Sequence, residues 1–332
     1  MTRNGNLKRR VRARMAKTGE SYMAALMHIR ERSTNDATAE ANTVRLAVAQ
    51  MTVFDDPRNI DELRTCGSEM RRLMLQAHEA GAKLVHFPEG ATCSPSKHIM
   101  SSTGPEHIGP SDWDLFEWAV LREELEAARN LAQDLGLWTI FGSVHQLSQS
   151  RRPHNSLYVI SDQGDLLTRY DERLLSNTKI SFMYTPGSVP VTFEVDGLRF
   201  GCALGMETHF PEIFIEYEQL DVDCVLFSTI GSPNSDLRAF AAEILGHAAS
   251  NSYWVSFSAN ANGCPAHPSG IVTPLGQWAA QCAADGFPSI AVVDINDNPG
   301  DFARPWRRIA RTGIYAQHQV DDDPRSDRRN TF

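Results

Sequence analysis

The chain has 332 residues, of which 42% are hydrophobic and 22% are charged, and its formal net charge is −9. This composition is typical of a globular protein with a substantial core. The negative charge argues against nucleic acid or an anionic membrane as a partner of the main body. No apolar stretch approaches the ~18–20 residues of a membrane-spanning helix, and no apolar segment of a secretory signal follows the basic N-terminus.

Cysteine usage indicates a reducing location. The cysteines show no CxxC pairing, and several lie inside apolar runs, where buried free thiols are expected. A cytoplasmic protein fits this pattern best. The six positions are Cys66, Cys93, Cys202, Cys224, Cys264 and Cys282.

Residues 1–43 form a basic N-terminal extension. Within it, Thr18 precedes a good helix-forming run, which predicts a short helix. A solvated or partner-docked helix is the favoured interpretation. Weak nucleic-acid contact is the alternative, through the basic residues Lys8, Arg9, Arg10, Arg12 and Arg14.

From Val44 onwards, short β-type runs alternate with amphipathic helical segments. Apolar residues at helical spacing predict helices within 55–82 and 113–135, after Phe210, and from Leu237 to Ala248. Alternating or continuous apolar runs predict strands at 44–51, 83–89, 137–146, 155–171 (a pair turning at Gly164), 191–205 (a hairpin turning at 196–197), 223–229, 253–260, 269–276, 277–282 and 289–296.

This order of elements implies a layered α/β architecture. No linker composition interrupts residues 44–300, so one domain is predicted over 44–310. The remaining residues, 311–332, form an acidic, arginine-containing tail that is expected to be mobile.

Glu89 is the first candidate for catalysis. It follows the apolar strand of "KLVHFPEG", and strand ends in α/β folds open into a crevice. A carboxylate beside Phe87 and Pro88 would be desolvated and its pKa raised, as a general acid or base requires. A glutamate that simply starts a loop is the alternative.

Three segments taken together are more specific: "KLVHFPEG", "TRYDERLLS…MYTPG" and "RFGCALGMETHFPEIF…VDCVLFSTIGSP". Their order and spacing resemble the nitrilase, or carbon–nitrogen hydrolase, superfamily. The resemblance covers about residues 44–310 and implies a four-layer αββα sandwich that pairs into dimers. Members of the family hydrolyse nitriles, amides or carbamoyl groups with Glu, Lys and Cys, which implies no metal and no organic cofactor.

The resemblance fails at two of the three principal catalytic positions. Glu89 matches the general base. In the "Tyr-x-Lys-x-x-Leu" pattern, the lysine position holds Glu172, and the cysteine position, five residues before Phe210, holds Gly205. Glu207 matches a frequently acidic position. The further glutamate expected before Pro-Gly is missing from residues 180–183.

Two cysteines are candidates for a relocated nucleophile. Cys202 lies on the strand that precedes Gly205, and alternation turns it away from the site, so a core thiol is expected. Cys93, on the loop after Glu89, is the better substitute. Arg173 is adjacent to the lysine position, and in a regular strand its side chain is expected to point outward, away from the site.

The remaining site residues predict an acidic pocket. Glu89, Glu172 and Glu207 would share protons or bind a cation, because like charges in one pocket cannot all remain ionised at low cost. An amine, guanidine or amidine ligand is favoured over a metal, since no tight ligand spacing is present. The alternative is that the site is a relaxed, water-filled remnant of the family's active site. Substrate contacts are expected from Met206, His209 and Tyr184.

Two hypotheses for the function follow. The first is an amidase-like enzyme with non-cysteine acid–base chemistry on a small cationic amide-, amidine- or nitrile-type compound; a relocated cysteine is its variant. The second is a catalytically inactive binding or scaffold protein. In either case the expected partners are a small molecule and a second copy of the chain, as a homodimer or higher homo-oligomer, without a membrane.

Overall fold

The computed structural model describes residues 12, 14–15, 41–148, 151–230, 237–263, 267–297 and 303–319. The chain divides into two compact units, residues 1–42 and residues 43–332, and every element described below belongs to the second. The helix predicted after Thr18 and most of the predicted tail lie outside the described residues.

Two sheets form the centre of this unit, each six-stranded within the described ranges. The first has the order β12-β1-β2-β3-β4-β5, from β1 (Thr43–Gln50), β2 (Leu84–His86), β3 (Trp138–His145), β4 (His154–Ile160), β5 (Leu166–Asp171) and β12 (Ser289–Asn296). The second has the order β11-β10-β9-β8-β7-β6, from β6 (Thr192–Val195), β7 (Leu198–Leu204), β8 (Cys224–Ser228), β9 (Trp254–Ser258), β10 (Gly270–Val272) and β11 (Trp278–Gln281).

The helices start and stop at recognisable signals. In α3 (Ile60–Glu79), the side chain of Asn59 accepts the first free N–H groups. The second helix, α4 (Trp118–Leu135), ends at Gly136 in the left-handed conformation. The remaining helices are α5 (Pro211–Gln219), which begins with a proline, α6 (Leu237–Asn251) and α7 (Ala303–Arg311).

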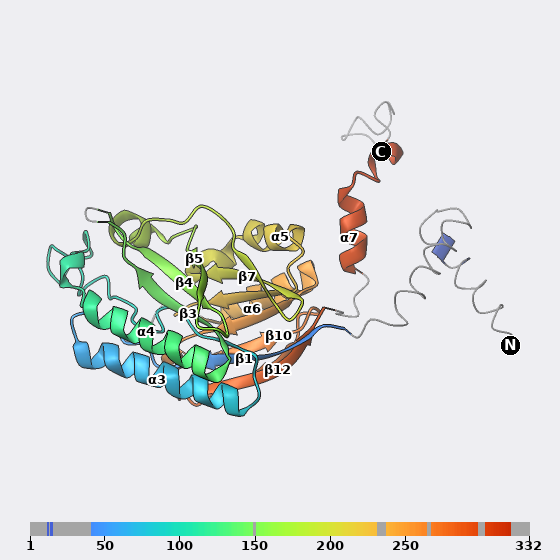
Figure 1. The fold of residues 1–332 in the computed structure, drawn as a ribbon. Coiled ribbons are helices and arrows are strands. Elements are labelled where there is room, and N and C mark those ends of the chain that lie inside the picture. Colours follow the sequence, from blue (N-terminus) through green and yellow to red (C-terminus); the bar gives the residue numbers. More distant parts are fainter. Residues whose placement is uncertain are drawn as a thin grey trace, which may run out of the picture. The chain divides into compact units, whose positions relative to one another are not determined.

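Side-chain alternation along the strands creates the layers. On β1, Leu46 and Val48 pack between the two sheets, whereas Ala47 and Ala49 pack against the outer layer that contains α3 and α4. The second sheet repeats this arrangement toward α5 and α6. Figure 1 shows α3 and α4 side by side along the first sheet. The predicted four-layer αββα sandwich is therefore confirmed.

Some element boundaries differ from the predictions. Residues 113–115 form a separate 3₁₀ turn, and the helix predicted from 113 begins at Trp118. A five-residue π-helix, Lys179–Met183, was not predicted. The helix α7 ends at Arg311, one residue past the predicted domain end, and its Arg304 is buried against Asp223. No described helix is long and apolar enough to cross a membrane.

The parallel strands bring three loops together. Strands β1, β2 and β3 are parallel in the first sheet, and β7, β8 and β9 are parallel in the second. Glu89 follows the carboxyl end of β2, Gly205 follows that of β7, and Ile230 follows that of β8. Ligand sites of α/β folds form at such ends, which identifies the region to inspect.

His86 connects the two sheets behind this region. Its imidazole is fully buried, with Nδ1 2.9 Å from the hydroxyl of Ser256 and Nε2 2.7 Å from that of Ser228. Ser228 in turn donates to the carbonyl of Phe87 at 2.8 Å. Burial lowers the pKa of His86 from 6.5 to about 3, so the ring is neutral in the folded protein.

This burial predicts a contribution to acid sensitivity. Because the folded pKa lies below the unfolded value, the unfolded chain binds the extra proton, and stability is lost as pH falls from 6.5 toward about 3. The loss should approach about 1.4 kcal/mol per pH unit inside that window. His86→Asn should flatten this slope in denaturant unfolding, whereas the exposed His98→Asn should leave it unchanged. An unchanged slope in His86→Asn would contradict the prediction.

Candidate active site

Glu89 lies in the loop after β2 and is buried, with 3% of its surface exposed. Its Oε1 accepts hydrogen bonds from Lys179 Nζ at 2.5 Å and from Asn155 Nδ2 at 2.8 Å. Its Oε2 accepts from the backbone N–H of Ile230 at 3.2 Å, which comes from the second sheet. Both carboxylate oxygens of Glu89 are thus engaged, and the residue links the two sheets.

Glu172 lies beside Glu89, directly after β5. Its Oε2 accepts from Asn155 Nδ2 at 2.6 Å and from Lys179 Nζ at 2.7 Å. Its Oε1 is buried and has no hydrogen-bond partner among the described residues. Burial raises the pKa of Glu172 to about 7; Lys179 opposes this shift and Glu89 adds to it. This carboxyl group is therefore able to exchange a proton near neutral pH.

The structure corrects the prediction of an acidic pocket without a cation. Lys179 forms ion pairs with Glu89 and Glu172, and its side chain is 18% exposed. Burial lowers the pKa of Lys179, but the neighbouring Glu172 and Glu89 outweigh this effect and the pKa is raised. The lysine is fully charged, because two carboxylates solvate its ammonium group in place of water.

The position of Lys179 explains why sequence reasoning missed it. It begins the π-helix Lys179–Met183, a rare element that apolar periodicity does not reveal. The available signal was its place in "TKISFMYTPG": Lys179 lies immediately before residues 180–183, where the family resemblance implies a glutamate. The charged residue at this place is a lysine, so a pattern specific for glutamate does not include it.

Asn155 is the second residue that the sequence did not reveal. In the register of β4 and β5, Ser156 pairs with Asp171, and the backbone N–H of Glu172 donates to the carbonyl of Asn155 at 2.9 Å. This pairing sets the amide of Asn155 beside both glutamates. A strand register defined by distant residues is not visible as a local motif.

Gly205 abuts the same cluster. Its φ is +63°, in the left-handed region that favours glycine. A Cβ built at this position would overlap Glu172 Oε1 and lie 2.9 Å from Glu172 Cδ and 3.0 Å from Lys179 Nζ. The space that the first side-chain atoms of a nucleophile would need is therefore occupied by the Glu172 carboxylate.

Glu207 belongs to a different network. It is fully buried, and its oxygens accept from the hydroxyl of Tyr170 and the backbone N–H groups of Arg173, Leu174 and Leu204, at 2.7–3.2 Å. Burial raises the pKa of Glu207, while these hydrogen bonds lower it and leave a net rise. Glu207 fastens the turn Gly205–His209 to the end of β5 through these hydrogen bonds, whose donors do not include Lys179.

The three expected substrate contacts lie at different distances from the cluster. Tyr184 is buried, and its backbone N–H donates to the carbonyl of Lys179 at 2.9 Å. Met206 is 37% exposed beside Gly205. His209 is directed toward α6, where its Nδ1 lies 2.8 Å from Glu243 Oε1 and its ring lies 4.8 Å from that of Phe240.

The five described cysteines are all buried, including both candidates for a relocated nucleophile. Cys202 is buried in the core between the sheets, as alternation predicts. Cys93 packs with Met183 and Tyr184, and burial raises its pKa well above the ordinary value. Cys264 lies outside the described residues. Arg173, expected to point outward, is instead half-buried, with Nε 3.2 Å from the hydroxyl of Tyr170.

The acidic residues do not form a recognisable metal site. Across the described ranges, no group of three or more His, Cys, Asp and Glu side chains is arranged to hold a metal ion. The ammonium group of Lys179 lies between the two carboxylates that come closest to such a group.

Comparison with known proteins identifies the family. The carbon–nitrogen hydrolase family model matches residues 45–299. The fold is similar to that of the C. elegans NitFhit protein (18% identity, TM-score 0.67, covering 85% of this chain and 67% of that one). It is also similar to that of an amidase from Nesterenkonia sp. (16% identity, TM-score 0.61, covering 82% and 98%). The chain belongs to the carbon–nitrogen hydrolase family.

Proposed function

We propose that this chain is a carbon–nitrogen hydrolase that uses water in place of a thiol nucleophile, with Glu172 as its acid–base group. The observation that carries the proposal is the unpartnered, fully buried Oε1 of Glu172 beside Gly205. Burying a polar atom without a partner is costly, which favours a role for the atom in binding water or substrate. A pKa of about 7 suits Glu172 for proton transfer in both directions.

The remaining residues have complementary roles in this mechanism. Glu172 Oε1 accepts a proton from the water that attacks the carbonyl carbon, and returns a proton to the departing nitrogen. The ammonium group of Lys179 faces the same space and stabilises the negative charge that develops on the carbonyl oxygen. Glu89 and Asn155 hold Lys179 and Glu172 in place. With an amide as substrate, one amide and one water molecule give a carboxylic acid and an amine or ammonia.

The proposed substrate is a small amide-, amidine- or nitrile-type compound. The sequence favoured a cationic compound because three carboxylates were expected without a cation. Lys179 now neutralises part of that charge, and Glu207 is bonded elsewhere. The preference for a cationic substrate stays a prediction, and the test therefore includes neutral amides beside amidines.

A non-catalytic binding protein is the second candidate. It is favoured by Glu89, whose two oxygens already accept three hydrogen bonds, from Lys179, Asn155 and the backbone N–H of Ile230, and which therefore has a structural role. In this case the hydrogen-bonded cluster of Glu89, Lys179 and Glu172 would stabilise the fold and would catalyse no reaction. An enzyme that uses a relocated thiol, Cys93 or Cys202, is the third.

One experiment separates the three candidates. Ammonia or amine release is measured with neutral amides, ureas, nitriles and amidines, in the wild type and in the variants Cys93→Ala and Cys202→Ala. We expect turnover of at least one neutral amide, unchanged turnover in both cysteine variants, and a loss of at least a hundredfold in Glu172→Gln, as for general acid–base groups. The matched control is Glu194→Gln, which removes an exposed carboxylate paired with Arg199.

Each other outcome identifies an alternative. If Cys93→Ala or Cys202→Ala abolishes turnover, or if the intact mass shows an acyl adduct, the reaction is assigned to a cysteine. Unchanged turnover in Glu172→Gln would remove the proposed role of that residue. If none of the compounds is turned over, while one of them raises the melting temperature, the non-catalytic candidate is correct.

A further inference from the structure

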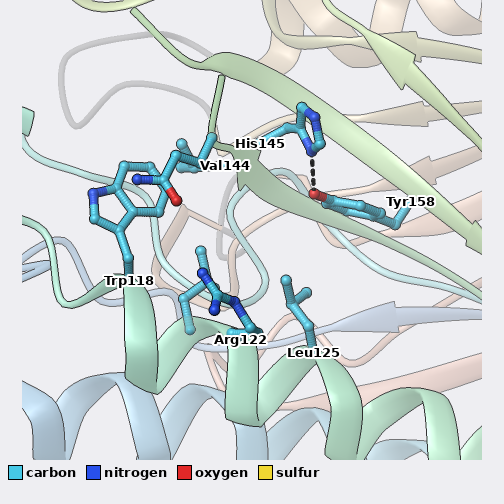
Figure 2. A pocket seen from close by; sticks show the side chains of 8 residues that line it. Trp118, Arg122, Leu125, Val144, His145 and Tyr158 are labelled. Atoms are coloured by element: carbon cyan, nitrogen blue, oxygen red, sulfur yellow. Dashed lines mark hydrogen bonds between the residues drawn. The ribbon is translucent and has the colours of Figure 1, made fainter. Parts of the chain in front are cut away.

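A pocket that shares no lining residue with the Glu172 cluster lies between α4 and the strands β3 and β4. Along β4, Leu157 and Val159 pack between the sheets, whereas Tyr158 packs toward the outer helices. The pocket has a volume of about 220 Å³ and is lined by α4 on one side and by β3 and β4 on the other. Figure 2 shows Trp118, Arg122 and Leu125 of α4 on one side and Val144, His145 and Tyr158 of the sheet on the other.

The walls suit a flat apolar group. Leu121 and Val144 are buried, and Trp118 and Leu125 are partly buried, so the pocket offers aliphatic surfaces and an indole ring. The indole N–H of Trp118 already donates to the carbonyl of Trp113 at 3.0 Å, and one face of its ring stacks on Phe116 with centroids 4.3 Å apart, so Trp118 offers the pocket only the rest of its ring. The volume is smaller than the roughly 300–1,000 Å³ of sites for drug-sized ligands, so it suits a single ring with one substituent.

The polar groups of the pocket favour a negative charge on that ligand. Arg122 lines the pocket, is exposed, and makes no ion pair with any described acidic residue, unlike Arg64 and Arg71, which pair with the acids of α4. A free guanidinium group binds carboxylates with two parallel hydrogen bonds.

The other polar pair in the pocket carries no opposing charge. His145 Nδ1 lies 2.7 Å from the hydroxyl of Tyr158, as Figure 2 shows. Burial, with Arg169 nearby, lowers the pKa of His145 to about 4, and burial raises the pKa of Tyr158 to about 12. Both groups are neutral at physiological pH, so Arg122 sets the charge of the lining residues.

We propose that this pocket binds a small aromatic carboxylate, with the ring between Trp118 and Tyr158 and the carboxylate on Arg122. The site is separate from the Glu172 cluster, and the proposal does not depend on the proposed function. Benzoate is the probe, and benzyl alcohol and benzylammonium are neutral and cationic probes of similar shape.

Ligand-observed NMR titration of the full chain tests the proposal. Benzoate should bind several times more tightly than either other probe, because only its carboxylate can pair with the exposed guanidinium group of Arg122. Arg122→Gln should remove this preference, and Leu121→Trp should abolish binding by filling the pocket. Arg129→Gln, an exposed arginine of the same helix outside the lining, should bind like the wild type.

Four results would overturn the proposal. The first three are the absence of benzoate binding at millimolar concentration, equal affinity for benzylammonium, and wild-type affinity in Arg122→Gln. Binding that survives Leu121→Trp but is lost in Glu172→Gln would locate benzoate at the other site and would also overturn it.

Discussion

Replacing Lys179 with methionine is expected to lower the free energy of unfolding by about 3–5 kcal/mol, the cost of leaving buried charges without their partner. Methionine keeps the length of the side chain but removes the cation that both Glu89 and Glu172 contact. The measurement is denaturant unfolding of wild type and variant, with Lys83→Met as the control. Lys83 pairs with Asp162 at a partly exposed site, where an ion pair contributes about 0–1 kcal/mol.

The loss of unfolding free energy caused by Lys179→Met should grow with pH. Lys179 lowers the pKa of Glu172, so its removal raises that pKa further above 7. A carboxyl group whose folded pKa is raised stabilises the protein below the unfolded value, 4.5, and this stabilisation is lost as pH rises through the folded value. Lys179→Met should therefore be most destabilised at about pH 8 and least at about pH 5.

A second substitution tests the electrostatic explanation. Adding Glu172→Gln to Lys179→Met removes one of the two carboxylates and should recover part of the lost stability. The remaining Glu89 retains Asn155 and the N–H of Ile230 as donors. A loss no larger than that of Lys83→Met, or no recovery in the double variant, would contradict this interpretation of the cluster.

Replacing Gly205 with alanine is expected to destabilise the protein by about 2–4 kcal/mol, through left-handed strain and overpacking. The added Cβ would overlap Glu172 Oε1, and the backbone φ is +63°. Gly205→Ala with Glu172→Ala should cost less than the sum of the single variants, because the overlap is removed. Additive costs in this double-mutant cycle would show that Glu172 does not fill the nucleophile position.

The same geometry predicts how a thiol could be restored. In Gly205→Cys, an ionised Glu172 about 4 Å from a thiolate would oppose it by about 4 kcal/mol at an effective dielectric near 20. Lys179 would offset part of this cost, but the overlap with Glu172 remains. Gly205→Cys should therefore form no acyl adduct with simple amides, whereas Gly205→Cys with Glu172→Ala leaves the thiol beside Lys179 and should form one. Intact-protein mass spectrometry distinguishes the two, and an adduct in Gly205→Cys alone would contradict the prediction.

The sequence by itself determined a layered α/β fold, because apolar residues at periods of two and of 3.6 distinguish strands from helices. The αββα order of the layers was implied by the family resemblance and not by the apolar pattern. In the structure, side-chain alternation directs Leu46 to the core between the sheets and Ala47 to the outer layer. The same reasoning assigned Cys202 to the core and Glu89 to a strand end, and both placements are confirmed. These features are local, so a local pattern reveals them.

Only the tertiary structure decided which charges meet at the site. Lys179 comes from a π-helix, Asn155 from a strand register and Ile230 from the other sheet, and their contacts with Glu89 span large separations along the chain. Conversely, Glu207 lies next to Gly205 in sequence, but the backbone N–H groups after β5 bind its carboxylate away from Lys179. Electrostatic energy depends on distances in space and on burial, and the order of residues along the chain fixes neither.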